Sequence, residues 1–175
     1  IALTAPLLGT IADRSGVRVR LLLLATVLGA AATGGLYLAG EGQWQLAVAL
    51  YLLASLGFWS GVTVNDALIL DVAESRDELD LISAYGYALG YVGGGLLFAA
   101  NVAMTLRPDL FGLASAAEAV RLSFLTVAIW WVVFSLPVFL FVREKPPAAP
   151  LGLLAAARAS FAELRSTVAQ LRSYR

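Results

Sequence analysis

The chain has 175 residues, of which 60% are apolar and only 14% are charged, with a formal net charge of zero at pH 7. Soluble domains are about 45–50% apolar and about 25% charged. The composition therefore excludes an ordinary soluble domain, and the balanced charge argues against a nucleic-acid partner. The sequence contains no cysteine and no histidine, which excludes disulfides, thiol chemistry and imidazole proton relays.

Five apolar segments are predicted to span a membrane, the first of them incomplete. The last four approach or exceed the roughly 18–20 residues that cross a bilayer core, and none has the polar face of a soluble core helix. The first resembles the last turns of a spanning helix, so we expect an internal piece of a longer protein. The predicted fold is an all-α integral membrane bundle with spans at about residues 1–12, 20–39, 46–70, 81–106 and 121–142.

The basic residues predict the orientation of these spans. All but two of the twelve lysines and arginines lie in residues 13–20, 71–80 and 143–175. The two exceptions, Arg107 and Arg121, belong to the opposite side. Because basic loops face the cytoplasm, the three basic segments are expected there, in a multi-pass protein of the bacterial inner membrane.

The first loop carries a spaced motif of five residues: Gly9, Asp13, Arg14, Gly16 and Arg18. Its spacing resembles the loop motif G-x-x-x-D-R-x-G-R-[RK] of the major facilitator superfamily, between helices 2 and 3. An acid at a helix end can meet the positive N-terminus of another helix, and glycine permits a tight turn. The resemblance implies a conformational role, locking two halves together in the outward-facing state. Val17 stands at a usually basic position and Arg20 adds a charge; a generic basic loop would explain the arginines but not the spacing.

The glycines of segment 20–39, such as Gly29, are expected to serve packing alone. Segment 46–70 instead places three cavity candidates on one face of its helix, opposite Gly57 and Gly61. An intramembrane charge costs about 2.5–3.5 kcal/mol at the helix centre and is usually functional. Asp66 lies about twenty residues after the start of the span, near the cytoplasmic edge. A role in gating and a role in binding a substrate or a proton therefore both remain open. The three candidates are Trp59, Thr63 and Asp66.

Segment 81–106 repeats glycine every four residues, at Gly86, Gly90 and Gly94. Each glycine costs about 1 kcal/mol against alanine in a helix, but in lipid small residues let helices approach closely. These three are predicted to pack against another helix, either statically or as a surface on which helices slide. Tyr87 and Tyr91 lie beside them as cavity candidates. Tyr91 is about ten residues into the span, near mid-bilayer depth, where a phenol needs a polar partner or a cavity.

Segment 121–142 contains Trp130 and Trp131, roughly eight or nine residues inside its outer boundary. An aromatic belt would place tryptophan at the interface, so both are candidates for packing or for a cavity wall. Pro137 is expected to bend this helix and free a carbonyl.

Residues 146–175 are predicted to form a cytoplasmic linker with an amphipathic helix. An apolar stripe and arginines repeated every seven residues indicate a helix that lies on the cytoplasmic leaflet or on the bundle. The stripe is Phe161, Leu164, Val168 and Leu171, and the arginines are Arg158, Arg165 and Arg172.

Five stretches in order resemble the vacuolar effluxer-like family of the major facilitator superfamily, related to the yeast autophagy permease: "NDALILDVA", "ISAYGYALGYVGGGLL", "PDLFGL", "VRLSFLTVAIWW" and "FSLPVFLFVRE". Leu70 departs from the family, which often has proline there. The resemblance implies that residues 1–145 hold the end of helix 2 and helices 3 to 6 of an N-terminal half. It also implies secondary transport of a small solute, with amino acids as the best-known substrate. The partners implied are the bilayer, the solute, a coupling ion and the C-terminal half.

Two other functions stay open: a membrane enzyme and a membrane scaffold or receptor. The sequence has no H-E-x-x-H, no G-x-S-x-G and no phosphate loop, so no catalytic residue, cofactor or metal is expected. Solute flux through the full-length protein separates these functions from transport.

Overall fold

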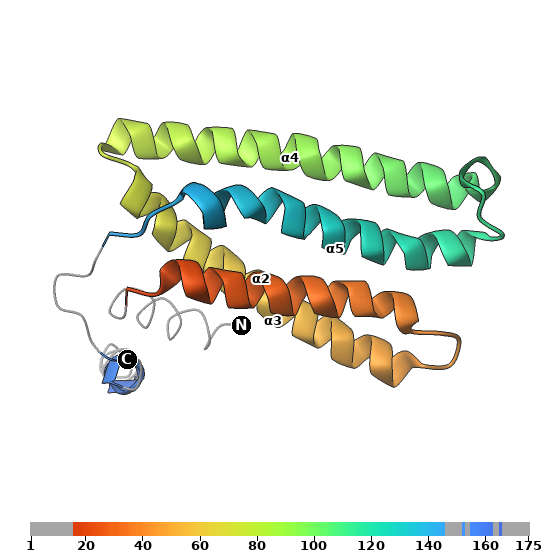
Figure 1. Ribbon diagram of the computed structural model, residues 1–175, viewed down its shortest axis with the longest axis horizontal. Helices are drawn as coiled ribbons and strands as arrows, with labels where there is room; N and C mark the ends of the chain where they lie inside the picture. Colours follow the sequence, from red (N-terminus) through yellow and green to blue (C-terminus); the bar gives the residue numbers. More distant parts are fainter. Residues whose placement is uncertain (1–15, 146–151, 153–154, 163–164, 166–175) are drawn as a thin grey trace, which may run out of the picture.

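A computed structural model describes residues 16–145, 152, 155–162 and 165 of the chain. In this part of the chain, four helices are long and apolar enough to cross a membrane (Figure 1), so the prediction of an all-α membrane bundle is confirmed. The predicted first span, residues 1–12, lies outside the described residues. In chain order the elements are α2 (Arg18–Gly35), η1 (Leu36–Leu38), α3 (Trp44–Val72), α4 (Arg76–Leu106), η2 (Pro108–Phe111) and α5 (Ala116–Phe141).

Helices α4 and α5 begin before the apolar runs that start at residues 81 and 121. A serine caps each of them: the Ser75 hydroxyl accepts a hydrogen bond from the Glu78 N–H at 3.2 Å, and Ser115 does the same for Glu118. Each glutamate also accepts from the backbone N–H just before its serine, a variant of the capping box. The spans predicted to begin at residues 81 and 121 therefore begin too late, because hydropathy marks where a helix enters lipid and the cap marks where it begins.

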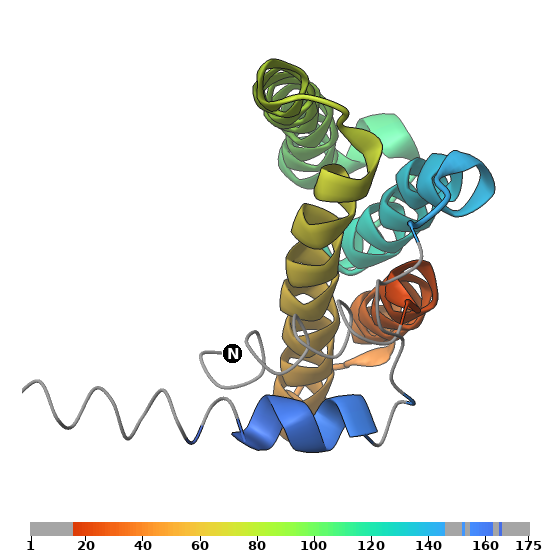
Figure 2. The same ribbon diagram turned by 90° about the vertical axis from the view of Figure 1, so that its left-hand side faces the viewer.

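Helix α2 packs against both α3 and α5, and α4 packs mainly against α5. Figure 2 views the bundle from the end where α2 begins and α3 and α5 finish, and shows α3 running obliquely past α2, α5 and α4. We call this end the inner end, which the charge rule predicts to be cytoplasmic. Helix α4 barely meets α3, so it stands at the edge of the bundle.

Helices α2 and α3 touch through glycine. A Cβ added to Gly57 would lie 2.6 Å from the Cα of Gly29, so the two backbones are in direct contact. Gly61 is also buried on this face, near Leu22 and Ala25. Small residues at a helix crossing allow this approach in lipid, and the packing role expected of Gly29 is confirmed.

Trp131 of α5 packs onto the same crossing. A Cβ on Gly29 would lie 2.2 Å from the tryptophan Cη2, so only glycine leaves room for the ring. Nearer the inner end, Leu22, Val64 and Leu68 form a buried cluster against Val138 and Val142. The three helices α2, α3 and α5 therefore form one packed body.

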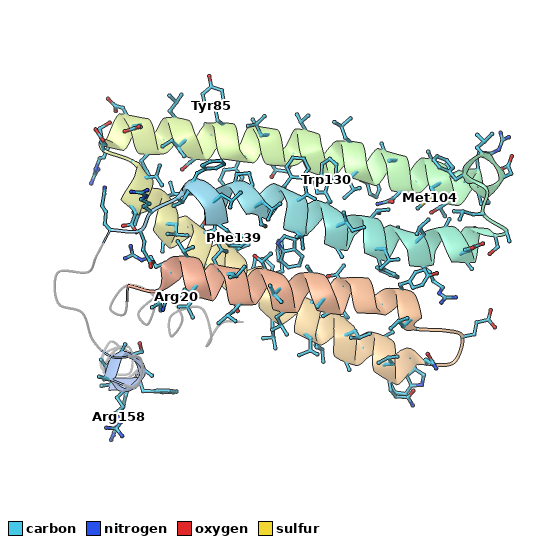
Figure 3. All side chains as sticks on the ribbon, viewed as in Figure 1. Arg20, Tyr85, Met104, Trp130, Phe139 and Arg158 are labelled. Atoms are coloured by element: carbon cyan, nitrogen blue, oxygen red, sulfur yellow. The ribbon has the colours of Figure 1, made fainter. Side chains whose placement is uncertain are left out.

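Helix α4 is different, because Met104 is its only buried residue. A Cβ added to Gly86, Gly90 or Gly94 would meet nothing within 4 Å among the described residues. Gly93 faces α5, where its Cβ would lie 3.5 Å from Trp130; Figure 3 shows that tryptophan between the two helices. The predicted helix contact of the three glycines has no partner in this part of the chain and stays a prediction.

Candidate solute path and inner charge cluster

A wide hollow of about 970 Å³ opens among α2, α3, α4 and α5. We call it the outer hollow. Its walls are rich in aromatic rings, and none of the described residues that line it carries a charge. The polar groups are a few hydroxyls and one amide. The lining residues used below are Ser55, Phe58, Trp59, Asn101, Trp130 and Trp131.

The amide in the outer hollow is held by a hydrogen bond between helices. The Thr126 hydroxyl lies 2.9 Å from Asn101 Oδ1 and 2.8 Å from the Ser123 carbonyl, and its single hydrogen is shared between these two acceptors. In lipid such bonds contribute about 0.6–2 kcal/mol. The bond joins α4 to α5, and Asn101, which the sequence did not single out as a site residue, is the amide among the described residues that line the outer hollow.

A smaller hollow of about 490 Å³ lies among α2, α3, α4 and α5. We call it the inner hollow. Unlike the outer hollow it contains a carboxylate, that of Asp66, together with the Asn65 amide and hydroxyls from α4. Ser83 and Tyr87 provide these hydroxyls, and Gly86 between them also lines the inner hollow.

Aromatic side chains separate the two hollows. Phe58 and Trp131 line both, and their rings meet edge to face with centroids 6.0 Å apart. Phe134 and Ser135 of α5 line both as well. A phenylalanine within an apolar run carries no pattern that distinguishes it, so the sequence could not have identified Phe58.

The structure distributes the predicted cavity residues unequally. Trp59 and Trp130 line the outer hollow and Trp131 lines both hollows, while Asp66 and Tyr87 line the inner one. Two others line neither. The Thr63 hydroxyl donates to the Trp59 carbonyl at 2.9 Å, and Tyr91 is 79% exposed on α4.

Charged residues meet where α2 begins. Gly16 has a φ of 63°, the left-handed region that glycine adopts without strain, and this is the tight turn expected of it. Arg18 then starts α2 and forms an ion pair with Asp71 near the end of α3; their side chains are only 16% and 10% exposed. The other motif residues, Gly9, Asp13 and Arg14, lie outside the described residues.

A second contact brings the end of α5 to the same place. Glu144 Oε2 accepts a hydrogen bond from the Val19 N–H at 3.3 Å, so a carboxylate lies at the positive N-terminus of α2, where it contributes about 0.3–1 kcal/mol. We call Arg18, Asp71 and Glu144 the inner charge cluster. The motif identified only Arg18; opposite charges at the ends of antiparallel spans are the signal that could have indicated its partners.

Comparison with known proteins gives one family and several relatives. The family described as "Vacuole effluxer Atg22 like" matches residues 1–80 and 69–175. The chain is 29% identical over 181 residues to YxiO, an uncharacterized MFS-type transporter of Bacillus subtilis (strain 168), covering all of this chain and 40% of that protein. No solved structure gives a significant match.

Two fungal proteins are also similar. Autophagy-related protein 22 of Yarrowia lipolytica is 27% identical over 97 residues, which are 54% of this chain and 16% of that protein. Autophagy-related protein 22-1 of Penicillium rubens is 34% identical over 67 residues, 37% of this chain and 10% of that protein. The chain therefore spans less than half the length of the curated relatives it matches.

Proposed function

Because the chain belongs to the vacuole effluxer Atg22-like family of the major facilitator superfamily, we propose that it is part of a secondary active transporter that moves a small solute by alternating access. Residues 1–145 belong to the N-terminal transmembrane half and residues 146–175 to the cytoplasmic linker. The membrane is the bacterial inner membrane, and amino acids are the first solutes to test. The chain itself is a multi-pass membrane protein.

The observation that carries this proposal is the pair of hollows that meet at Phe58 and Trp131. Together they follow α3, α4 and α5 from the outer part of the bundle toward its inner end. In this proposal the outer hollow receives the apolar part of the solute on Trp59 and Trp130. Asp66 provides the charge in the inner hollow, for the solute or for a coupling ion, since intramembrane carboxylates usually serve such roles.

The inner charge cluster supports the conformational part of the proposal. Its contacts hold the inner ends of α2, α3 and α5 together, so these helices move as one body. Asp13 of the motif, just before this body, then engages the other half of the transporter in one state only. A contact present in one of two states biases the equilibrium between them by its full free energy.

The test is solute flux with the full-length protein in proteoliposomes, using a panel of labelled amino acids. We expect Trp59→Ala and Trp130→Ala to raise KM about tenfold, because losing an aromatic contact of about 1.4 kcal/mol weakens binding by that factor. Trp44→Ala is the matched control: Trp44 is 67% exposed at the start of α3 and lines neither hollow.

Three results would contradict the proposal. Absence of flux for every solute would favour a scaffold or receptor. An equal effect of Trp44→Ala would remove the special role of the hollows. Loss of inserted protein in the Trp59 and Trp130 variants, with KM unchanged, would mean that another helix of the full-length protein fills the outer hollow.

A further inference from the structure

Residues 155–162 and 165 are helical, and we call this segment the tail helix. Figure 1 shows it end-on beside spanning helices that run across the page, and Figure 2 shows it lengthwise at the inner end. It therefore lies crosswise to the spanning helices, level with the inner end of the bundle.

The two faces of the tail helix differ in exposure. Ala156 is 0% exposed and Ser160 is 2% exposed, so one face is fully covered. At 100° per residue, Arg158, Phe161 and Arg165 share an arc of about 60° on the opposite face. All three are exposed, and Phe161 is 62% exposed.

The exposed face combines two guanidinium groups with an aromatic ring. Its other exposed members in the described segment are Ala155 and Ala162, so the described residues of this face include no acid. Figure 3 shows Arg158 directed away from the bundle. Guanidinium binds phosphate in a two-pronged geometry, and an aromatic residue beside basic residues is typical of helices that lie in a bilayer interface.

We propose that the exposed face of the tail helix binds the anionic lipid of the cytoplasmic leaflet. Arg158 and Arg165 hold lipid phosphates, and Phe161 enters the boundary between headgroups and acyl chains. Two observations favour anionic lipid as the binding partner: the positive charge of the two arginines complements the lipid phosphates, and the helix lies at the inner end. Arg20, Arg143 and Lys145 are exposed at that same end, and they attract the same lipids. This proposal does not depend on which solute the protein moves.

The experiment places an environment-sensitive fluorophore on the exposed face of the full-length protein. Ala162→Cys provides the attachment point and keeps Phe161; this segment has no native cysteine, and cysteines elsewhere in the full-length protein are replaced. The protein is reconstituted into vesicles of phosphatidylcholine alone or mixed with phosphatidylglycerol. We expect blue-shifted, stronger emission in the anionic vesicles, decreasing as salt screens the charges.

Two variants and one control sharpen the result. Arg158→Gln and Arg165→Gln should each weaken docking about fivefold in a titration of the anionic lipid, as expected for one basic residue near an anionic surface. Arg107→Gln is the matched control, because its guanidinium pairs with Asp109 at the opposite end of α4. It should leave the titration unchanged.

Several outcomes would overturn the proposal. Equal emission in neutral and anionic vesicles would mean that the face meets water or the other half of the protein. Displacement of the signal by inorganic phosphate would indicate a site for a soluble anion instead. An effect of Arg107→Gln as large as that of Arg158→Gln would show only a general response to net charge.

Discussion

Two sets of glycines in one small bundle have opposite surroundings. At the crossing of α2 and α3, Gly29 and Gly57 touch through their backbones, and Trp131 fills the remaining space. On α4, Gly86, Gly90 and Gly94 face open space within the described residues. In both sets the glycines would let another helix approach closely, but only the first set contacts such a helix in this part of the chain.

This difference teaches that small-residue spacing reveals a contact surface without revealing what covers it. Gly29 and Gly57 are both buried in the α2–α3 contact, as expected of a fixed joint. The α4 surface belongs to a helix with one neighbour, α5, and almost no contact with α3. Its partner, in our proposal, lies elsewhere in the full-length protein, where a contact can form and separate during transport.

The largest effect is expected at the closed joint. Gly57→Leu should abolish correctly folded protein, because even a Cβ there would lie 2.6 Å from the Cα of Gly29, and backbone cannot yield as a flexible side chain does. The measurement is the yield of monodisperse full-length protein in detergent. A normal yield would mean that the α2–α3 crossing is not the joint described above.

Gly90→Leu should leave that yield intact and abolish flux, because contacts through small residues have no room for a branched chain. Gly90→Ala should be tolerated, since alanine improves helix propensity by about 1 kcal/mol. The control is Gly95→Leu, on another face of α4, which should do less harm to flux per inserted protein. Equal loss at positions 90 and 95 would end the idea of a moving glycine surface.

A smaller loss of stability is expected at the ion pair that joins α2 to α3, between Arg18 and Asp71. Asp71→Asn removes the carboxylate paired with Arg18 and should destabilise the protein by about 1–3 kcal/mol, less than a fully buried pair because both side chains keep some exposure. The readout is the melting temperature of the purified full-length protein. Asp77→Asn, an exposed acid in the first turn of α4, serves as the comparison and should change little.

The smallest effect on stability is expected from Asp13→Asn, which should impair transport while the amount of inserted protein stays nearly constant. A carboxylate at a helix terminus contributes about 0.3–2 kcal/mol, which is enough to shift a two-state equilibrium. Flux normalised to inserted protein measures this. Wild-type flux would mean that the loop motif only marks topology.

The sequence predicted the membrane bundle, because hydropathy is a local property. Of the three candidates placed on one face of α3, Trp59 and Asp66 line different hollows and Thr63 lines neither. The sequence did not predict which face meets which neighbour. Nothing near Gly29 indicates Trp131, because the contact joins distant segments, and the partners of Arg18 could have been indicated only by the opposite charges at the ends of other spans. The helix starts at Ser75 and Ser115 were predictable, because each serine is followed three residues later by glutamate.

The edge position of α4 has a consequence for how the chain is made. Chains emerge from the ribosome N-terminus first, so α2 and α3 are available to each other before the later helices exist. Helix α4 is the least apolar of the four spans, and the most apolar, α5, follows it directly. Since α5 is its main neighbour and Thr126 bonds Asn101 across the pair, α4 gains most of its contacts in this part of the chain only after α5 has been made.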